Sequence, residues 1–219
     1  DFLGVACVGE GVALRRNGLT VPILVLGSLF PEEAFLVVRH GLTQAVGDWQ
    51  AACALSRAAT QLERSVSIHL KVDTGMGRYG VWHEEAISLT RRLVQLPGLR
   101  SEGVLTHLSM AGQSAEATQS QLARFTQVLR RLKKAKLPTG IRHVANSVGL
   151  LKFPRSHWDL VRSGLLLYGV SPLKDSRLPV RLKPALTLKS RIRFLKTVPE
   201  AETVSYGGTF RASRPTKVA

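Results

Sequence analysis

The sequence has few cysteines, few aromatic residues and no long apolar run. Only Cys7 and Cys53 occur among 219 residues, so we predict no disulfide framework and interpret both as reduced thiols of a cytoplasmic protein. The longest apolar stretches, at 21–27 and 165–170, are far shorter than the roughly 20 residues of a membrane helix, so no membrane partner is expected. Asp1 opens a segment with no signal-like pattern, so we expect the chain to begin inside a gene product.

Acidic residues are also scarce, because 15 Asp and Glu stand against 31 Lys and Arg, a formal net charge of +16. Such an excess raises nucleic acid or an anionic surface as a partner. The cations concentrate at 130–136, near a predicted helix end, and at 174–196. We interpret both as solvated basic surfaces, the first favoured by the helix dipole, so nucleic acid is not the expected partner. An anion-binding surface is the alternative.

What the sequence does contain, as far as residue 173, is a regular alternation of short β-branched runs and longer amphipathic stretches. This order is typical of parallel βαβ units with helices outside the sheet. Seven strands fit either an open doubly wound sheet or an α/β barrel of the (β/α)8 TIM type that is one strand short. The expected strands are 3–7, 22–26, 44–46, 66–72, 103–106, 142–144 and 159–162. The expected helices are 9–16, 31–39, 84–96, 115–136 and 148–152, together with one that Asp48 caps and that carries Ala51, Ala52, Leu55 and Ala59 on one side.

The pattern changes after Pro172. Residues 185–198 and 203–210 are β-rich with no helical stretch between them, which is typical of the start of an antiparallel β domain. About 40 residues are too few for a complete β domain with its own core. We therefore predict a barrel domain with seven strands over 1–175, which the resemblance described below numbers as strands 2–8, and an incomplete β domain over 176–219.

Polar residues follow four successive predicted strands, where barrel enzymes carry their chemistry. Lys71 lies near the end of an apolar strand, so it must be paired, neutral or modified. From the residues alone it is either a Schiff-base lysine or an ion-pair partner of Asp73. The Gly-rich segment after Asp73 leads to Arg78, which could bind an oxyanion, although simple loop geometry also explains the glycines.

The later strands end in His107, in His143 with Asn146 and Ser147, and in Arg162 with its neighbours. Both histidines could be satisfied core residues, and no ligand spacing supports a metal, so none is predicted. The last two strands of barrels often bind phosphate, so a phosphorylated ligand is inferred. Asn146 could instead cap a short helix, with Ser147 in its first turn.

Five motifs together resemble the alanine racemase family, the pyridoxal-phosphate (PLP) enzymes of fold type III, over nearly the whole chain. They are His-Leu-Lys-Val-Asp-Thr-Gly-Met-Gly-Arg-Tyr-Gly at 69–80, Thr-His at 106–107, His-Val-Ala-Asn-Ser at 143–147, Val-Arg-Ser-Gly-Leu-Leu-Leu-Tyr-Gly at 161–169 and Val-Ser-Tyr-Gly-Gly-Thr-Phe at 204–210.

The resemblance implies a PLP-dependent isomerase that interconverts L- and D-alanine, supplies D-alanine for peptidoglycan and works as a homodimer. It also implies that no catalytic residue lies in this chain. The family's Schiff-base lysine belongs to the first barrel strand, and its catalytic tyrosine belongs to a motif beyond Ala219. We therefore expect an incomplete fragment without efficient racemisation. A broader-specificity racemase of this fold, or a non-catalytic PLP- or anion-binding module, is the alternative.

Residue by residue, the resemblance assigns Lys71 as a carbamylated lysine, which replaces the Schiff-base interpretation. Arg78 then binds PLP and the substrate carboxylate. Arg162 faces the pyridine nitrogen, with His143 and His107 in its hydrogen-bond surroundings. The remaining PLP-binding residues are those around the phosphate, namely Asn146, Ser147, Gly164 and Leu165. The chain departs from the family at 107–112, His-Leu-Ser-Met-Ala-Gly, where the family carries an acidic residue.

Overall fold

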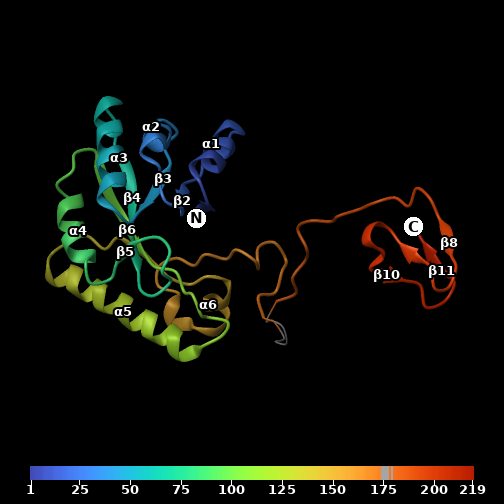
Figure 1. Ribbon diagram of the computed structural model, residues 1–219. Coiled ribbons are helices and arrows are strands. Elements are labelled where there is room, and N and C mark those ends of the chain that lie inside the picture. Colours follow the sequence, from blue (N-terminus) through green and yellow to red (C-terminus); the bar gives the residue numbers. More distant parts are fainter. Residues whose placement is uncertain (174–177, 179) are drawn as a thin grey trace. The chain divides into compact units, whose positions relative to one another are not determined.

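A computed structural model describes residues 1–173, 178 and 180–219 (Figure 1). The chain divides into two compact units, Asp1–Lys183 and Pro184–Ala219, and each is described by itself. The domain boundary predicted between 175 and 176 lies outside the described residues.

The first unit has an α/β fold built on one sheet, whose six main strands are all parallel and follow the order β1-β2-β3-β4-β6-β7. A short seventh strand, β5, pairs with the end of β4. This is a half-barrel with its strands in barrel order. The strand bounds are β1 Leu3–Val5, β2 Ile23–Val25, β3 Thr43–Val46, β4 Val66–Asp73, β5 Val81–Trp82, β6 Leu99–Leu105 and β7 Ile141–His143.

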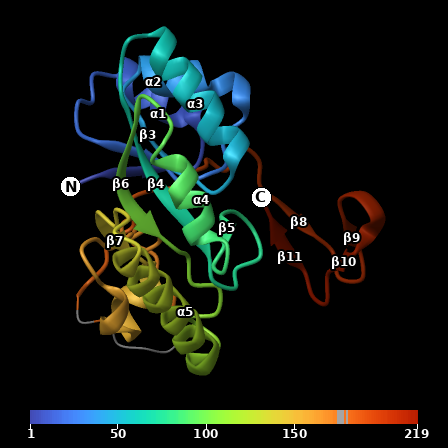
Figure 2. The ribbon, with the colours of Figure 1, turned by 90° about the vertical axis from the view of Figure 1, so that its left-hand side faces the viewer.

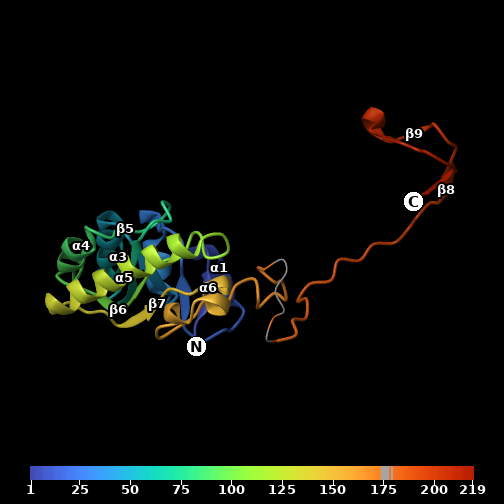
Figure 3. The ribbon, with the colours of Figure 1, turned by 90° about the horizontal axis from the view of Figure 1, so that it is seen from below.

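Helices connect the strands and cover one face of the sheet (Figure 2), and a view from below shows α3, α4 and α5 grouped on one side of this unit (Figure 3). Side-chain caps start three of them: Asp48 accepts from Ala51 N at 2.8 Å, and Ser114 and Asn146 do the same for α5 and α6. The helices are α1 Val8–Arg16, α2 Ala34–Arg39 after the 3-10 turn η1 Pro31–Glu33, α3 Trp49–Gln61, α4 Ala86–Leu93, α5 Ala115–Lys134 and α6 Ser147–Lys152, followed by η2 Pro154–Ser156.

The strand expected over 159–162 is wrong, because only an isolated parallel bridge joins Leu160 to His143. Arg142 N would donate to a neighbouring strand in a regular ladder, but here it donates to the Asp159 carboxylate at 2.8 Å. A side chain thus replaces the backbone acceptor at this position. The segment still follows β7, since Arg162 N donates to Ala145 O at 2.8 Å.

The second unit contains two small antiparallel pairs. Strands β8 Lys196–Val198 and β11 Thr216–Val218 form one, and β9 Thr203–Val204 and β10 Phe210–Arg211 form the other, with η3 Tyr206–Gly208 between β9 and β10. The β-rich interpretation of 185–195 is wrong, since these residues form no strand. Leu186 and Leu188 are 83% and 95% exposed, so neither packing nor a ladder partner holds them extended.

Among the described residues, no helix combines the length and apolar character that a membrane crossing requires.

The helical layer depends on large buried side chains such as Phe125 of α5, which is fully buried and meets the Trp158 ring edge-on at 6.0 Å between centroids. We predict that Phe125→Ala lowers the free energy of unfolding by about 3–5 kcal/mol, because it leaves a cavity. Urea unfolding measures the change. The control is Phe30→Ala, since Phe30 is 67% exposed and its loss should cost about 0.5 kcal/mol or less. Equal losses in the two variants would contradict this packing.

Candidate functional site

The polar residues of β4 lie on one face of the strand because side chains alternate along it. Ile68, Leu70 and Val72 belong to the hydrophobic core, whereas His69, Lys71 and Asp73 face the opposite side. All three polar side chains are nevertheless buried. Burial of three ionisable groups on one strand costs free energy unless each finds a partner, so this face is the natural place to look for a site.

Asp73 organises the Gly-rich loop that follows β4. Its Oδ1 accepts from Gly75 N and Met76 N, both at 2.8 Å, and its Oδ2 accepts from Arg78 N at 3.1 Å. Gly75 and Gly77 have φ of +132° and +67°, values that favour glycine. The loop therefore presents Arg78 at a defined position while its guanidinium remains exposed.

Lys71 is buried but forms no ion pair with Asp73 in the part of the chain that the structure describes. Its ammonium donates to Leu26 O at 2.7 Å and lies 5.1 Å from the centre of the Tyr79 ring. Burial, and then the positive charge of Arg78, lowers the pKa of Lys71 to about 8. Lys71, Arg78 and Tyr79 line a cavity of about 140 Å³, so a small anion or a modified amine fits between them.

Arg162 links the ends of β6 and β7. Its Nη2 donates to Thr106 O at 2.8 Å and to Val144 O at 3.0 Å, and its Nη1 lies 2.9 Å from His143 Nδ1. His107 Nδ1 lies 3.4 Å from Nη2. Burial and the Arg162 charge lower the pKa of His143 to about 2 and that of His107 to about 4, so both rings are neutral acceptors at pH 7.

Beside Arg162, several donors have no partner among the described residues. The backbone N–H groups of Gly164 and Leu165 make no hydrogen bond there, and neither does the buried Ser147 hydroxyl. Asn146 differs, because its side chain accepts from Gly149 N at 2.9 Å and donates to Leu108 O at 3.2 Å. The free donors suit an anion such as phosphate, whereas Asn146 acts as the helix cap that was the alternative prediction.

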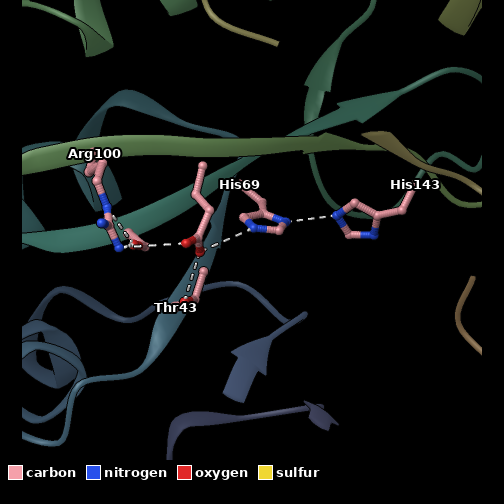
Figure 4. Close-up of polar contacts among 6 residues, drawn as sticks. Thr43, His69, Arg100 and His143 are labelled. Carbon is pink, nitrogen blue, oxygen red and sulfur yellow. Dashed lines mark hydrogen bonds and ion pairs between the residues drawn. The ribbon is translucent and has the colours of Figure 1, made fainter. Parts of the chain in front are cut away.

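Two histidines form a contact that sequence reasoning missed. His69 Nδ1 lies 2.7 Å from His143 Nε2, and His69 Nε2 lies 3.5 Å from Glu102 Oε2 (Figure 4). The available signal was the alternation that places His69 on the same face as Lys71. Glu102 carried no signal, because it lies in the middle of β6 and not at the strand end. In the described part of the chain, no three His, Cys, Asp or Glu side chains come together as a metal site.

Comparison with known proteins adds to this geometry. Residues 1–172 match the family described as "Alanine racemase, N-terminal domain", and residues 185–219 match "Alanine racemase, C-terminal domain". An alanine racemase of Symbiobacterium thermophilum is 43% identical over 100% of this chain and 58% of its own length. One of Desulfosudis oleivorans is 42% identical over 99% of this chain and 58% of its length.

Solved structures give the same result. An alanine racemase of Clostridium difficile 630 superposes with a TM-score of 0.91 at 32% identity, covering 99% of this chain and 58% of that one. An alanine racemase of Bacillus anthracis, with bound L-Ala-P, has a TM-score of 0.88 at 30% identity over 98% of this chain and 56% of that one. The present chain thus spans a little over half the length of the proteins it matches.

The Asp73 loop supplies a test that needs no ligand. We predict that Asp73→Ala lowers the free energy of unfolding by about 1–3 kcal/mol, because three backbone donors lose their acceptor. Hydrogen exchange at the Gly75, Met76 and Arg78 amides should accelerate together. Asp73→Asn, which keeps one side-chain oxygen, is the matched control and should lose less. Unchanged exchange in the alanine variant would show that Asp73 does not hold the loop.

Proposed function

Because the chain belongs to the alanine racemase family, we propose that it supplies the non-covalent part of a PLP site in a protein that interconverts L- and D-alanine. The observation that carries this proposal is the Arg162 cluster. A guanidinium has two neutral imidazoles beside it, and the backbone of Arg162 joins the segment of Gly164 and Leu165 to Ala145, two residues before Ser147. This donor set fits a ring nitrogen and a phosphate on one molecule.

The phosphate would be held by the Ser147 hydroxyl and by the amides of Gly164 and Leu165. Backbone N–H groups bind phosphate oxygens well, and no described residue competes for these donors. Asn146 would contribute indirectly, since its side chain caps α6 and thereby fixes the position of Ser147. This modifies the expectation that Asn146 itself binds the cofactor.

Arg162 would face the pyridine nitrogen. Its Nη1 and Nη2 atoms are occupied by His143 and by the Thr106 and Val144 carbonyls, whereas Nε makes no hydrogen bond with the described residues. When bound, PLP supplies an electron sink for a carbanion at the substrate Cα. An arginine retains its proton, so it donates a hydrogen bond without protonating the ring. A less electron-deficient ring favours return of a proton to Cα, which is the outcome racemisation requires.

We propose further that Lys71 is carbamylated. The modification replaces a buried cation with an anion that complements Arg78, which lines the same cavity. Arg78 would then be oriented toward PLP and the substrate carboxylate. The pKa of about 8 supports this assignment, because only the neutral amine reacts with CO2.

Three parts of the proposal concern the whole protein. The Schiff-base lysine and the catalytic tyrosine are expected in segments other than these 219 residues. The protein is expected to be a cytoplasmic homodimer, and its product is expected to supply D-alanine for peptidoglycan. Alanine is the proposed substrate because the relatives at 43% and 42% identity are named alanine racemases.

PLP binding to the chain tests the central assignment. We expect PLP to bind without forming a covalent bond, and Arg162→Ala to weaken binding about 10–100-fold, the equivalent of one charge-assisted hydrogen bond. Fluorescence titration measures the affinity. Arg155→Ala, at an exposed position of η2, is the charge-matched control and should bind as the parent does.

A borohydride experiment complements the titration. The chain is incubated with PLP, reduced and mapped by peptide mass spectrometry, and alanine racemisation is assayed in parallel. Absence of an adduct and of turnover agrees with a chain that lacks the Schiff-base lysine. An adduct on Lys71 together with turnover would instead make Lys71 the Schiff-base residue and contradict the carbamylation proposal.

The pH dependence of Lys71 provides a separate test. With a pKa of about 8, about a tenth of the amine is neutral at pH 7, against about one part in 3,000 for an unshifted lysine at 10.5. The neutral amine and CO2 form the carbamate with release of a proton, so at constant dissolved CO2 the initial rate of carbamylation should increase as pH rises toward 8 and level off above it. 13C NMR with labelled CO2 detects the carbamate. Lys133, exposed on α5, should stay unmodified at pH 8 and is the internal control.

A further inference from the structure

A line of polar contacts leads from Arg162 through the sheet to the opposite end of the strands. Arg162 Nη1 lies 2.9 Å from His143 Nδ1, His143 Nε2 lies 2.7 Å from His69 Nδ1, and His69 Nε2 lies 3.5 Å from Glu102 Oε2. Figure 4 shows the part of this line between His143 and His69. These four residues, Arg162, His143, His69 and Glu102, are called the histidine chain below.

Hydrogen-bond chemistry gives the histidine chain one direction. A guanidinium can only donate, so His143 Nδ1 must be an unprotonated acceptor. A neutral His143 then carries its proton on Nε2 and donates to His69 Nδ1. His69 must in turn accept at Nδ1 and carry its own proton on Nε2, which points to Glu102. A proton on either Nδ1 would bring two N–H groups together at 2.7 or 2.9 Å.

The surroundings favour the same arrangement. Both imidazoles are completely buried. Burial lowers the pKa of His69, although the Glu102 carboxylate acts in the opposite direction. Burial and the Arg162 charge lower the pKa of His143. The two rings are therefore neutral, and the formal charges lie only at the two ends, positive at Arg162 and negative at Glu102.

Glu102 ends the histidine chain at a partly exposed position. Its side chain is 25% exposed, it accepts from Thr43 Oγ1 at 3.3 Å, and its other oxygen lies 3.5 Å from Arg100 Nη2. It lines a cavity of about 310 Å³ together with Thr43 and Val66, the first residues of β3 and β4. This end of the parallel strands is opposite to the end that carries Arg162.

We propose that Glu102 is a positioning residue for Arg162, acting through His69 and His143. Among the described residues His69 Nε2 has no hydrogen-bond partner, and the Glu102 carboxylate at 3.5 Å is the group that stabilises its N–H. A negative charge at that N–H makes His69 Nδ1 a stronger acceptor, and the effect continues to His143 Nδ1. The Arg162 guanidinium is thereby held with its Nε–H directed at the cofactor ring. The orientation of Arg162 toward the cofactor rests on the proposed function, whereas the direction of the hydrogen bonds along the histidine chain does not.

Ring 15N NMR of the histidines, recorded without PLP, tests the protonation states predicted for the histidine chain. We expect both His69 and His143 as neutral Nε2–H tautomers. In Glu102→Gln, which removes the charge and keeps the shape, the Nδ1 resonances of both rings should shift. Ser67→Ala is the control, because it removes the Arg100 contact beside Glu102 and leaves the histidine chain intact. It should leave both rings unchanged.

PLP affinity provides the second readout. Glu102→Gln should weaken PLP binding about three- to tenfold, the size expected when one charge-assisted hydrogen bond is weakened and not lost. Ser67→Ala should not change the affinity. An Nδ1–H tautomer at His143 in the parent, or a His143 resonance that stays in place in Glu102→Gln, would overturn the proposal. If Glu102→Gln fails to fold, the tautomers of the parent protein still decide the direction of the hydrogen bonds along the histidine chain.

The two proposals fail in different ways. Expected tautomers without any PLP binding would contradict the proposed function and leave the histidine chain standing. PLP binding that is lost in Arg162→Ala, combined with a His143 resonance insensitive to Glu102, would support the function and reject Glu102 as a positioning residue.

Discussion

The site depends on one physical constraint, the burial of a guanidinium that can donate hydrogen bonds but never accept them. Arg162 therefore needs acceptors on several sides, and it finds them in the Thr106 and Val144 carbonyls and in His143. These partners come from the ends of β6 and β7, so one side chain joins two strand ends. The same requirement keeps His143 neutral, and its neutrality determines which atom of His69 carries a proton.

The parallel sheet explains why such a cluster can form. Strands that run in the same direction bring their carboxyl ends to one edge, and alternation along β4 places His69 and Lys71 on the face away from the hydrophobic core. Polar groups also continue along that face away from the strand ends, as far as Glu102 in the middle of β6. The site is thus the end of a polar layer that extends along the strands, which resembles a barrel interior more than a surface cleft.

Sequence reasoning succeeded where the signal is local. Asp48 as a helix cap, the glycines of the loop after Asp73 and the alternation of strands and helices each depend on a few neighbouring residues, and each is present in the structure. It failed at 159–162 and at 185–195. In the first segment a carboxylate took the place of a ladder acceptor, and in the second no partner strand is present in the described part of the chain. Strand formation requires a partner, and local composition does not report one.

The sequence by itself determined the α/β class, the parallel direction of the strands and the residues at their carboxyl ends, because periodicity and loop chemistry are encoded over a few residues. Only the tertiary structure decided how those residues are connected. His69 and His143 meet although they are 74 positions apart, and Arg162 donates to the carbonyl of Thr106 although 56 positions separate them. Such pairings, and the protonation states that follow from them, depend on which strands become neighbours in space.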